Sequence, residues 1–267
     1  MSHYSIQQLT ARVLSNEAAA PDAFRLTLQP RSLPDGITAG QFIMLRTSAH
    51  LDPLLRRAFS IHDRTDSTLS ILYQIRGRGT GWMAARAPGD EIDLIGPLGR
   101  GFGTTLPIKK ALLIAGGIGI APFYLLIREL QAKGVEVLLF YGARRETELV
   151  GLNELEQMGV SLILATEDGS LGEKGRVTEL FQENFRPVEP AENFKIFACG
   201  PQGMLFEVAR IAKQTGMECD VSLESNMACG LGTCMGCVIE TKTGYQRVCR
   251  EGPVFSAKEL DLSAGGC

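Results

Sequence analysis

Residues 109–134 read KKALLIAGGIGIAPFYLLIRELQAKG. The apolar start of this stretch predicts a buried strand, the glycine cluster predicts a tight turn, and the rest predicts a helix that ends at Gly134. No charge occurs over the 17 residues from Ala111 to Ile127, which is the lower limit for a membrane span. Glycines and Pro122 interrupt this run, so we predict a strand–turn–helix unit and no membrane segment.

The alternation of strand and helix continues toward the C-terminus. Apolar runs typical of buried strands are separated by amphipathic helical patterns, an order that predicts crossover units and a parallel sheet. The pattern stops after Gly216. The strand patterns lie at 135–144, 161–169 and 193–201, and the helical patterns at 146–159, 177–185 and 203–216.

The first hundred residues have a different texture. Short alternating runs separated by turn residues predict antiparallel strands, and their number and spacing favour a small barrel. These runs lie at 11–15, 24–30, 41–47, 59–63, 67–75 and 91–97. We therefore expect an α+β multidomain protein, with a β-barrel domain over 1–103, an α/β nucleotide domain with a parallel sheet over 104–220, and a small cysteine-containing segment over 221–267.

Composition narrows the class of protein. The chain is 45% hydrophobic and 21% charged, with a net charge of -3, which is typical of a soluble globular protein. No basic stripe is present, so we expect no nucleic-acid partner. The N-terminus lacks a basic region followed by an apolar run, so we expect no secretory signal. Seven cysteines in such a chain favour metal or redox use over a disulfide framework.

Four of these cysteines stand close together, at Cys229, Cys234, Cys237 and Cys249, with the spacing C-x4-C-x2-C-x11-C. Tetrahedral zinc and iron–sulfur clusters both use four thiolates. Structural zinc usually takes two C-x2-C pairs, and only one is present. The C-x4-C-x2-C triplet is the spacing of plant-type 2Fe–2S proteins. We therefore predict that these four cysteines bind a 2Fe–2S cluster, with structural zinc as the alternative.

Glycines between the cysteines support the same prediction. Gly230, Gly232 and Gly236 permit the positive-φ turns of a loop that approaches a cluster closely. The run from Val238 to Val248 predicts a short hairpin with Gly244 at its turn, which would return the fourth cysteine to the other three.

The glycine turn within 109–134 predicts a nucleotide site. Gly116, Gly117 and Gly119 follow a strand and open a helix, where backbone N–H groups attract a pyrophosphate. The turn departs from the G-x-G-x-x-G pattern, so close packing of strand against helix is the alternative. The polar loop at 165–175 either contacts the adenine end of a nucleotide or is a solvated surface loop.

Two further groups of residues carry weaker signals. Cys199, Gly200 and Pro201 end a buried strand, where ligand crevices form in such sheets, although a small core residue is the alternative for Cys199. The strand 57–60, Arg-Ala-Phe-Ser, and the glycine turn with Thr80 offer an arginine and hydroxyls that can hold phosphates.

Together, these motifs resemble the ferredoxin–NADP reductase superfamily. The resemblance implies that Arg57 contacts the pyrophosphate of FAD, that Phe59 and Ser60 lie along the flavin, and that Cys199 lies near the hydride-transfer centre. The implied FAD contacts are Arg57, Ala58, Phe59, Ser60, Leu72, Tyr73, Gln74, Gly79 and Thr80. The implied nicotinamide-nucleotide contacts are Gly116, Gly117, Gly119, Gly200 and Pro201.

The cysteine segment after the nucleotide domain makes the whole chain similar to the electron-transfer subunits of type B dihydroorotate dehydrogenase. That family implies a cytoplasmic subunit that passes electrons from an FMN-containing catalytic partner through 2Fe–2S and FAD to NAD+ in pyrimidine biosynthesis, as a heterotetramer of two of each. Ala58 departs from the proline that this subunit type often has. We expect Cys219 and Cys267 not to be ligands, and the tail after Leu260 matches nothing in the family.

Several alternatives stay open. Arg144 and Arg145 follow a strand where they could bind the 2′-phosphate of NADP, although the resemblance favours NAD. The same domains occur in the small subunits of sulfide dehydrogenase and of NADH-dependent ferredoxin:NADP oxidoreductase, and in stand-alone oxygenase reductases. A non-catalytic nucleotide-binding module held together by zinc is a further alternative.

Overall fold

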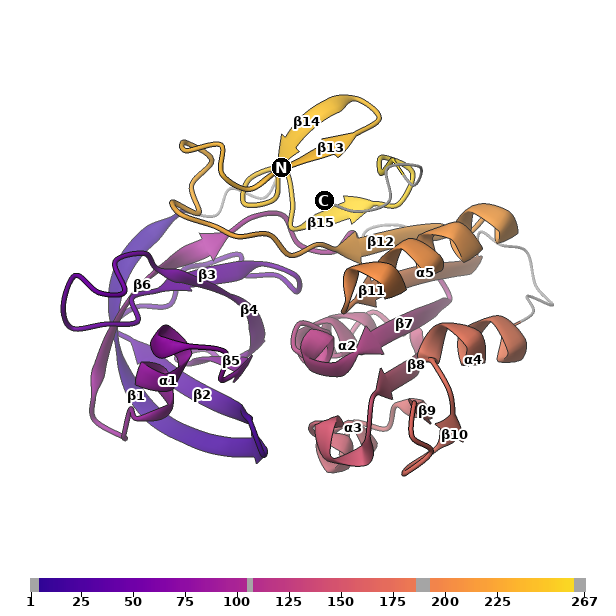
Figure 1. Ribbon diagram of the computed structural model, residues 1–267, viewed down its shortest axis with the longest axis horizontal. Coiled ribbons are helices and arrows are strands. Elements are labelled where there is room, and N and C mark those ends of the chain that lie inside the picture. The colour runs from indigo at the N-terminus through magenta and orange to yellow at the C-terminus, as the bar shows by residue number, and fades with distance from the viewer. Residues whose placement is uncertain (1–4, 105–107, 186–192, 262–267) are drawn as a thin grey trace.

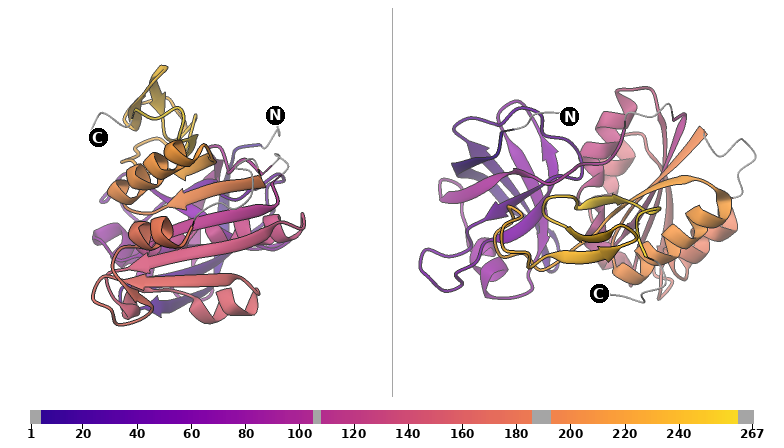
Figure 2. Two further views of the ribbon diagram at one scale, coloured as in Figure 1. Left: turned by 90° about the vertical axis from the view of Figure 1, so that its right-hand side faces the viewer. Right: turned by 90° about the horizontal axis from the view of Figure 1, so that it is seen from above.

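Two units lie side by side in the computed structural model, which describes residues 5–104, 108–185 and 193–261. One unit is an antiparallel barrel and the other is a sheet with helices on both faces (Figure 1). The C-terminal segment lies across the top of both units, as the view from above shows (Figure 2). No helix in these ranges is long and apolar enough to cross a membrane.

The N-terminal unit is a closed six-stranded barrel with strand order β1-β2-β5-β4-β3-β6. Every neighbouring pair is antiparallel, and closure removes the free edges that an open sheet would expose. The elements are β1 (Gln7–Ala20), β2 (Ala23–Pro30), β3 (Phe42–Leu45), β4 (Arg57–Arg64), β5 (Leu69–Gln74), a short helix α1 (Arg78–Ala84) and β6 (Glu91–Leu98).

The second unit is a seven-stranded sheet with order β10-β9-β8-β7-β11-β12-β15. All neighbours are parallel except β12 and β15. β8, β9 and β10 lie on one side of β7, and β11, β12 and β15 lie on the other. The sheet therefore has its switch point between β7 and β11. The strands are β7 (Lys110–Gly116), β8 (Glu136–Ala143), β9 (Ser161–Thr166), β10 (Glu173–Lys174), β11 (Phe194–Cys199), β12 (Glu218–Ser222) and β15 (Val254–Ser256).

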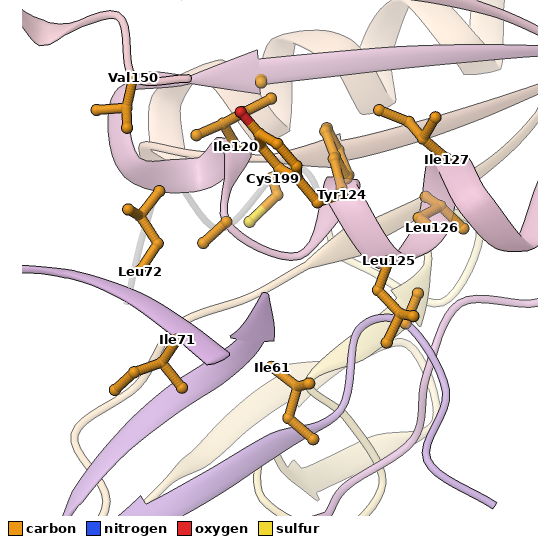
Figure 3. Close-up of a cluster of buried hydrophobic side chains, with 14 of the residues drawn as sticks. Ile61, Ile71, Leu72, Ile120, Tyr124, Leu125, Leu126, Ile127, Val150 and Cys199 are labelled. Atoms are coloured by element: carbon orange, nitrogen blue, oxygen red, sulfur yellow. The ribbon is translucent and has the colours of Figure 1, made fainter. Parts of the chain in front are cut away.

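Helices cover both faces of this sheet, and two buried apolar clusters hold the layers together. One cluster joins the barrel to α2 and the facing side of the sheet, so the two units share a core (Figure 3). The other joins α4 and α5 to the opposite side and continues into the C-terminal segment. The helical elements are η1 (Gly117–Ile120), α2 (Phe123–Gln131), η2 (Glu146–Glu148), α3 (Leu152–Gln157), α4 (Val177–Asn184) and α5 (Gln202–Thr215).

The predicted fold class is confirmed: a barrel, a parallel-sheet unit and a C-terminal segment occur in that order. The sequence pattern did not predict β12 or β15. Both are short, and β12 carries Glu218 and Asp220, whose charges mask its strand character. Asp220 forms an ion pair of 2.9 Å with Lys195, a side chain only 5% exposed, and that buried partner makes a charge in this strand tolerable.

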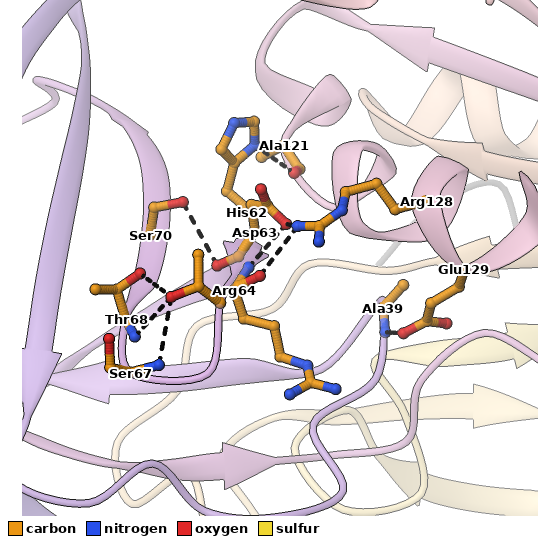
Figure 4. A network of polar contacts seen from close by, with 11 residues as sticks. Ala39, His62, Asp63, Arg64, Ser67, Thr68, Ser70, Ala121, Arg128 and Glu129 are labelled. Atoms are coloured by element: carbon orange, nitrogen blue, oxygen red, sulfur yellow. Dashed lines mark hydrogen bonds and ion pairs between the residues drawn. The ribbon is translucent and has the colours of Figure 1, made fainter. Parts of the chain in front are cut away.

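Polar contacts also connect the barrel to α2 (Figure 4). Arg128 on α2 forms an ion pair of 2.5 Å with Asp63 on β4. The next residue, Glu129, accepts a hydrogen bond of 2.9 Å from the backbone N–H of Ala39. Since one helix bonds to two separate barrel segments, the orientation of the sheet unit against the barrel is fixed.

The most deeply buried of these contacts comes from His62 on β4. Its Nδ1 lies 2.8 Å from the carbonyl oxygen of Ala121, the residue between η1 and α2, and its ring packs on Tyr124. The side chain is 2% exposed. Burial is the largest effect on the pKa of His62 and lowers it to about 4. The hydrogen bond to the Ala121 carbonyl opposes this shift, the nearby cation Arg25 adds to it, and the charges of Asp63 and Glu154 oppose it. His62 is therefore neutral at pH 7, and Nδ1 donates to the carbonyl.

This burial makes stability depend on pH. Between pH 6.5 and 4 the unfolded chain binds a proton at His62 and the folded chain does not, so acid favours unfolding. We predict that the difference in unfolding free energy between wild type and H62F shrinks by about 3 kcal/mol from pH 7.5 to pH 4. Urea unfolding at a series of pH values measures this. A difference that is independent of pH would contradict a neutral buried imidazole.

Candidate functional site

The four predicted cluster cysteines lie in the loop and hairpin of the C-terminal segment, and within the described residues no three of them surround a single point. Cys237 and Cys249 are buried, Cys229 is half-buried, and Cys234 is exposed. The backbone N–H of Cys249 lies 3.5 Å from Cys237 Sγ, and the Cys229 thiol interacts with that of Cys234. The thiols therefore form two neighbouring pairs.

The predicted hairpin is present and explains how Cys249 returns. Strands β13 (Val238–Thr241) and β14 (Gly244–Arg247) pair antiparallel, with Gly244 at φ 108° in the turn. Beyond the last pair, the N–H of Val248 donates to the carbonyl of Cys237 at 2.9 Å. This bond places Cys249 beside Cys237.

The loop before the hairpin has the backbone that a cluster site requires. Gly230 and Gly232 have φ values of 69° and 82°, which a side chain would strain. The carbonyl of Gly232 accepts a hydrogen bond of 2.8 Å from Arg247, which anchors the loop to the hairpin. Burial raises the pKa of the Cys229 thiol, but backbone N–H groups that include Leu231 lower it to about 6 overall. These donors favour a thiolate, the form that binds metal.

The paired thiols fit a two-iron cluster. Burial and the thiol of Cys237 raise the pKa of Cys249 to about 12. In a 2Fe–2S cluster each iron takes two thiolates, so two pairs match its ligand set.

The cluster loop packs against the barrel beside the strand that contains Arg57. A methyl group at Gly230 would lie 2.7 Å from Cγ of Met44 on β3. Met44 pairs directly with Ala58 on β4. Further on, the carbonyl of Gly252 accepts a hydrogen bond of 2.6 Å from the N–H of Arg100. The loop is thus one strand away from the predicted FAD strand.

The predicted FAD strand, residues 57–60, is half-buried along its length. An orphaned polar atom lies beside it: the Thr47 hydroxyl is fully buried and has no hydrogen-bond partner among the described residues. A methyl group at Gly79 would lie 2.8 Å from this hydroxyl and 3.7 Å from Cγ of Arg57. An arginine, a buried hydroxyl without a partner and a glycine too closely packed to carry a side chain fit a phosphate-containing group such as FAD.

Other predicted FAD residues divide into two groups. Thr80 caps the short helix α1, because its hydroxyl accepts hydrogen bonds from the N–H groups of Arg76 (2.8 Å) and Gly77 (3.2 Å). Leu72 and Tyr73 are buried instead, and the Tyr73 hydroxyl donates to Asn16 Oδ1 at 3.1 Å. A flavin can therefore contact these two residues only through their backbone. The sequence motif does not show that their side chains are buried.

The glycine turn packs directly onto the end of β11. A methyl group at Gly119 would lie 2.3 Å from the carbonyl oxygen of Cys199, and one at Gly116 would lie 2.7 Å from Pro201. The close-packing alternative is confirmed, and the nucleotide site at this turn stays a prediction. Its glycines allow close packing, and the same turn borders a cleft.

That cleft has a volume of about 1510 Å³ and runs along the carboxyl ends of β7, β8, β9 and β11. It contains Gln74 of the barrel, so it extends from the sheet to the predicted flavin strands. The structure brings together these predicted residues along its wall: Gln74, Gly116, Gly117, Gly119, Gly200 and Pro201.

Cys199 does not line this cleft. Its side chain is 3% exposed and lies near Ile120, on the side of the turn that faces Leu72 of the barrel (Figure 3). Burial raises the pKa of this thiol to about 12, and Ser222 is its hydrogen-bond partner. The thiol is neutral, and its place beside hydride transfer stays a prediction.

Sequence reasoning missed Glu224, which lines the cleft five residues before the first cluster cysteine. Burial raises the pKa of this carboxyl, while the charge of Arg76 lowers it. Its only signal in the sequence is its position between the sheet and the cysteines. Thr47 was missed as well, because a threonine just after a strand gives no signal of an unpaired hydroxyl.

Comparisons with known proteins agree with these parts. Residues 224–261 match the iron–sulfur cluster binding domain of dihydroorotate dehydrogenase B, and residues 113–210 match the oxidoreductase NAD-binding domain. The dihydroorotate dehydrogenase B (NAD(+)) electron transfer subunit of Listeria innocua is 39% identical, over 96% of this chain and 99% of its own.

Two solved structures are also similar. An NADH-dependent reduced ferredoxin-NADP oxidoreductase structure has a TM-score of 0.83 at 25% identity, over 95% of this chain and 90% of its own. Flavohemoglobin from Malassezia yamatoensis with bound FAD and heme has a TM-score of 0.62 at 21% identity, over 79% of this chain and 57% of its own, which shows the fold alone.

The packing of the glycine turn yields a test. We predict that G119A lowers the unfolding free energy by about 1–3 kcal/mol and weakens NAD+ binding, because its methyl group pushes the turn away from β11. G203A, in α5 with nothing within 4 Å, should keep or slightly raise stability. Chemical denaturation and calorimetry measure both effects. Equal stability of the two variants would show that the turn can move freely.

Proposed function

The chain belongs to the family of the dihydroorotate dehydrogenase B (NAD(+)) electron transfer subunit, and from this premise we propose which of its residues carry electrons between a catalytic partner and NAD+. In this family role, electrons from dihydroorotate pass from the partner through 2Fe–2S and FAD to NAD+ in pyrimidine biosynthesis. The protein is an oxidoreductase that acts as one subunit of a larger complex.

One observation supports this proposal most strongly: the three candidate sites are contiguous. The cluster loop packs on Met44, whose strand pairs with that of Ala58, and the nucleotide cleft reaches Gln74 in the same barrel. Electron transfer requires that donor and acceptor groups lie near one another. A structural cluster would not need to lie beside the flavin strand.

The chain's residues then have distinct tasks. Arg57, with the Thr47 hydroxyl and the close backbone approach that Gly79 permits, holds the phosphates of FAD, and Phe59 and Ser60 border its flavin. The turn from Gly116 to Gly119 holds the pyrophosphate of NAD. When bound, FAD connects the two-electron chemistry of NAD to the one-electron chemistry of the 2Fe–2S cluster. The protein positions these groups and tunes their reduction potentials.

The remaining assignments complete the proposal. The cluster ligands are Cys229, Cys234, Cys237 and Cys249. The chain divides into a FAD barrel (1–103), an NAD domain (104–220) and a cluster segment (221–267). The catalytic partner contains FMN and forms a cytoplasmic heterotetramer with two copies of this subunit, and it docks near the exposed Cys234.

A second candidate function has a specific observation in its favour. The NADH-dependent ferredoxin-NADP oxidoreductase structure superposes over 95% of this chain, so a different partner could use the same scaffold. Isolation of the native complex distinguishes the two candidates. Recovery of an FMN-containing dihydroorotate dehydrogenase supports our proposal, and recovery of a large iron–sulfur flavoprotein refutes it. A stand-alone oxygenase reductase would be recovered without a tight partner.

Substitution of one ligand tests the route of electrons. We predict that the wild-type subunit contains about one FAD and two irons, and that C234S loses the iron and the dihydroorotate-dependent reduction of NAD+. NADH-driven reduction of a dye should largely survive, because FAD and NAD sites are separate from Cys234. Iron analysis, absorption spectra and the two assays measure these effects.

The matched control is C219A. Cys219 is buried in β12 and lies outside the cluster loop, so this variant should keep its iron and both activities, with some loss of stability. Loss of iron in C219A but not in C234S would refute the ligand assignment. Zinc in place of iron in the wild type would refute the electron-transfer role of the segment.

A further inference from the structure

Two arginines lie where the cleft passes the end of β8. Arg144 and Arg145 follow this strand directly, and Arg144 lines the cleft. The sequence leaves their role open, because a pair of arginines at a strand end can bind the extra 2′-phosphate of NADP. Their surroundings in the structure answer this question.

Both guanidinium groups are held by one carboxylate. Arg144 makes two contacts with Glu148, at 3.1 Å (Nε to Oε2) and 2.9 Å (Nη2 to Oε1). Arg145 Nε lies 3.5 Å from Oε1 of the same carboxylate. Glu148 is the more buried partner, with a side chain 24% exposed, against 67% and 60% for the arginines. The hydrogen bonds that Arg144 donates to Glu148 raise the pKa of Arg144.

A second carboxylate faces the same place from the next strand. Glu167 follows β9 and lines the cleft, and its charge also acts on Arg144. The charge of Arg145 acts on Asp168, the residue after Glu167. The arginines therefore lie between acidic residues of two strand ends, η2 on one side and the loop after β9 on the other.

The direction of the dinucleotide follows from the sheet. A pyrophosphate at the glycine turn lies over β7, and the nicotinamide half extends toward β11, whose end at Cys199 faces Leu72 of the barrel (Figure 3). The adenosine half then extends over β8 and β9, where the ends of these strands line the cleft. The adenine ribose and its 2′ position consequently lie near Arg144, Glu148 and Glu167.

We infer that Glu148 is a specificity-determining residue: together with Glu167 it offsets the charges of Arg144 and Arg145 and so excludes NADP while NAD is accepted. This inference rests on the proposed function of the cleft. A 2′-phosphate brings up to two negative charges beside Glu148 and Glu167, and the arginines that would compensate them are already paired. A ribose hydroxyl carries no charge and meets no such repulsion.

The test compares NADPH with NADH in the FAD-containing protein. We predict that E148Q raises the ratio of kcat/KM for NADPH to kcat/KM for NADH at least tenfold, because it frees the guanidinium groups and removes one charge. The binding of adenosine 2′,5′-bisphosphate, measured by calorimetry, should tighten in parallel. The gain should fall at high salt, since the groups are exposed.

E146Q is the matched control, because Glu146 belongs to the same short helix but does not line the cleft. It should leave the ratio unchanged. The triple variant R144A/R145A/E148Q should lose the gain, because the arginines carry it. Arg176, at the start of α4, also lines the cleft. If Arg176 bound the 2′-phosphate, neither E148Q nor the triple variant would change the ratio.

Two results would overturn the inference: a ratio in E148Q within twofold of the wild type, or a gain that persists in the triple variant. Failure of the proposed function gives a different result, since the wild type would then reduce a dye with neither NADH nor NADPH. Calorimetry still tests Glu148 in that case, because binding of adenosine 2′,5′-bisphosphate does not depend on turnover.

Discussion

The antiparallel pairing of β15 with β12 determines where the cysteine segment lies. Val221 pairs with Phe255 at the edge of the sheet. One residue before β15, Pro253 forms a β-bridge with Arg100, which follows the last barrel strand. The chain between β12 and β15 must therefore start and end on the sheet while it reaches the barrel. Its hairpin and loop lie above the junction of the two units (Figure 1), and the loop packs on Met44, one strand away from the predicted flavin strand, as a result.

The junction below that segment is held by buried polar pairs as well as by apolar packing. Lys195 on β11 donates to the carbonyl of Gly103 at 2.7 Å and pairs with Asp220, and His62 donates to Ala121 on the other side. Apolar packing alone tolerates sliding, whereas a buried donor left without its acceptor costs about 1–3 kcal/mol. These bonds therefore fix the register between the barrel and the sheet, on which the alignment of flavin and nicotinamide depends.

Much of this architecture could be predicted from the sequence, because it depends on local patterns. Period-two runs mark the barrel, strand–helix alternation marks the sheet, and the spacing of the cysteines marks the cluster loop. What could not be predicted depends on partners distant in sequence. Asp220 makes the sequence of β12 too polar for a predicted strand, and its ion pair with Lys195 is seen only in the structure. Tyr73 belongs to a motif that predicts a flavin contact, yet its hydroxyl donates to Asn16. Glu148 is an exception, because it is only four residues from Arg144 and three from Arg145, but the sequence does not show that one carboxylate binds both guanidinium groups.

The unequal exposure of the four thiols also bears on how the protein matures. Folding closes Cys237 and Cys249 inside the hairpin and leaves Cys234 at the surface, between Leu231 and Met235, which are 42% and 51% exposed. Iron and sulfide must therefore enter from the Cys234 side. Until they do, Cys229 and Cys234 are the thiols most open to oxidation, because backbone donors favour the thiolate of Cys229 and Cys234 is exposed. The newly made subunit thus has a vulnerable period between folding and loading, and a docked partner that covers this rim would bring it to an end.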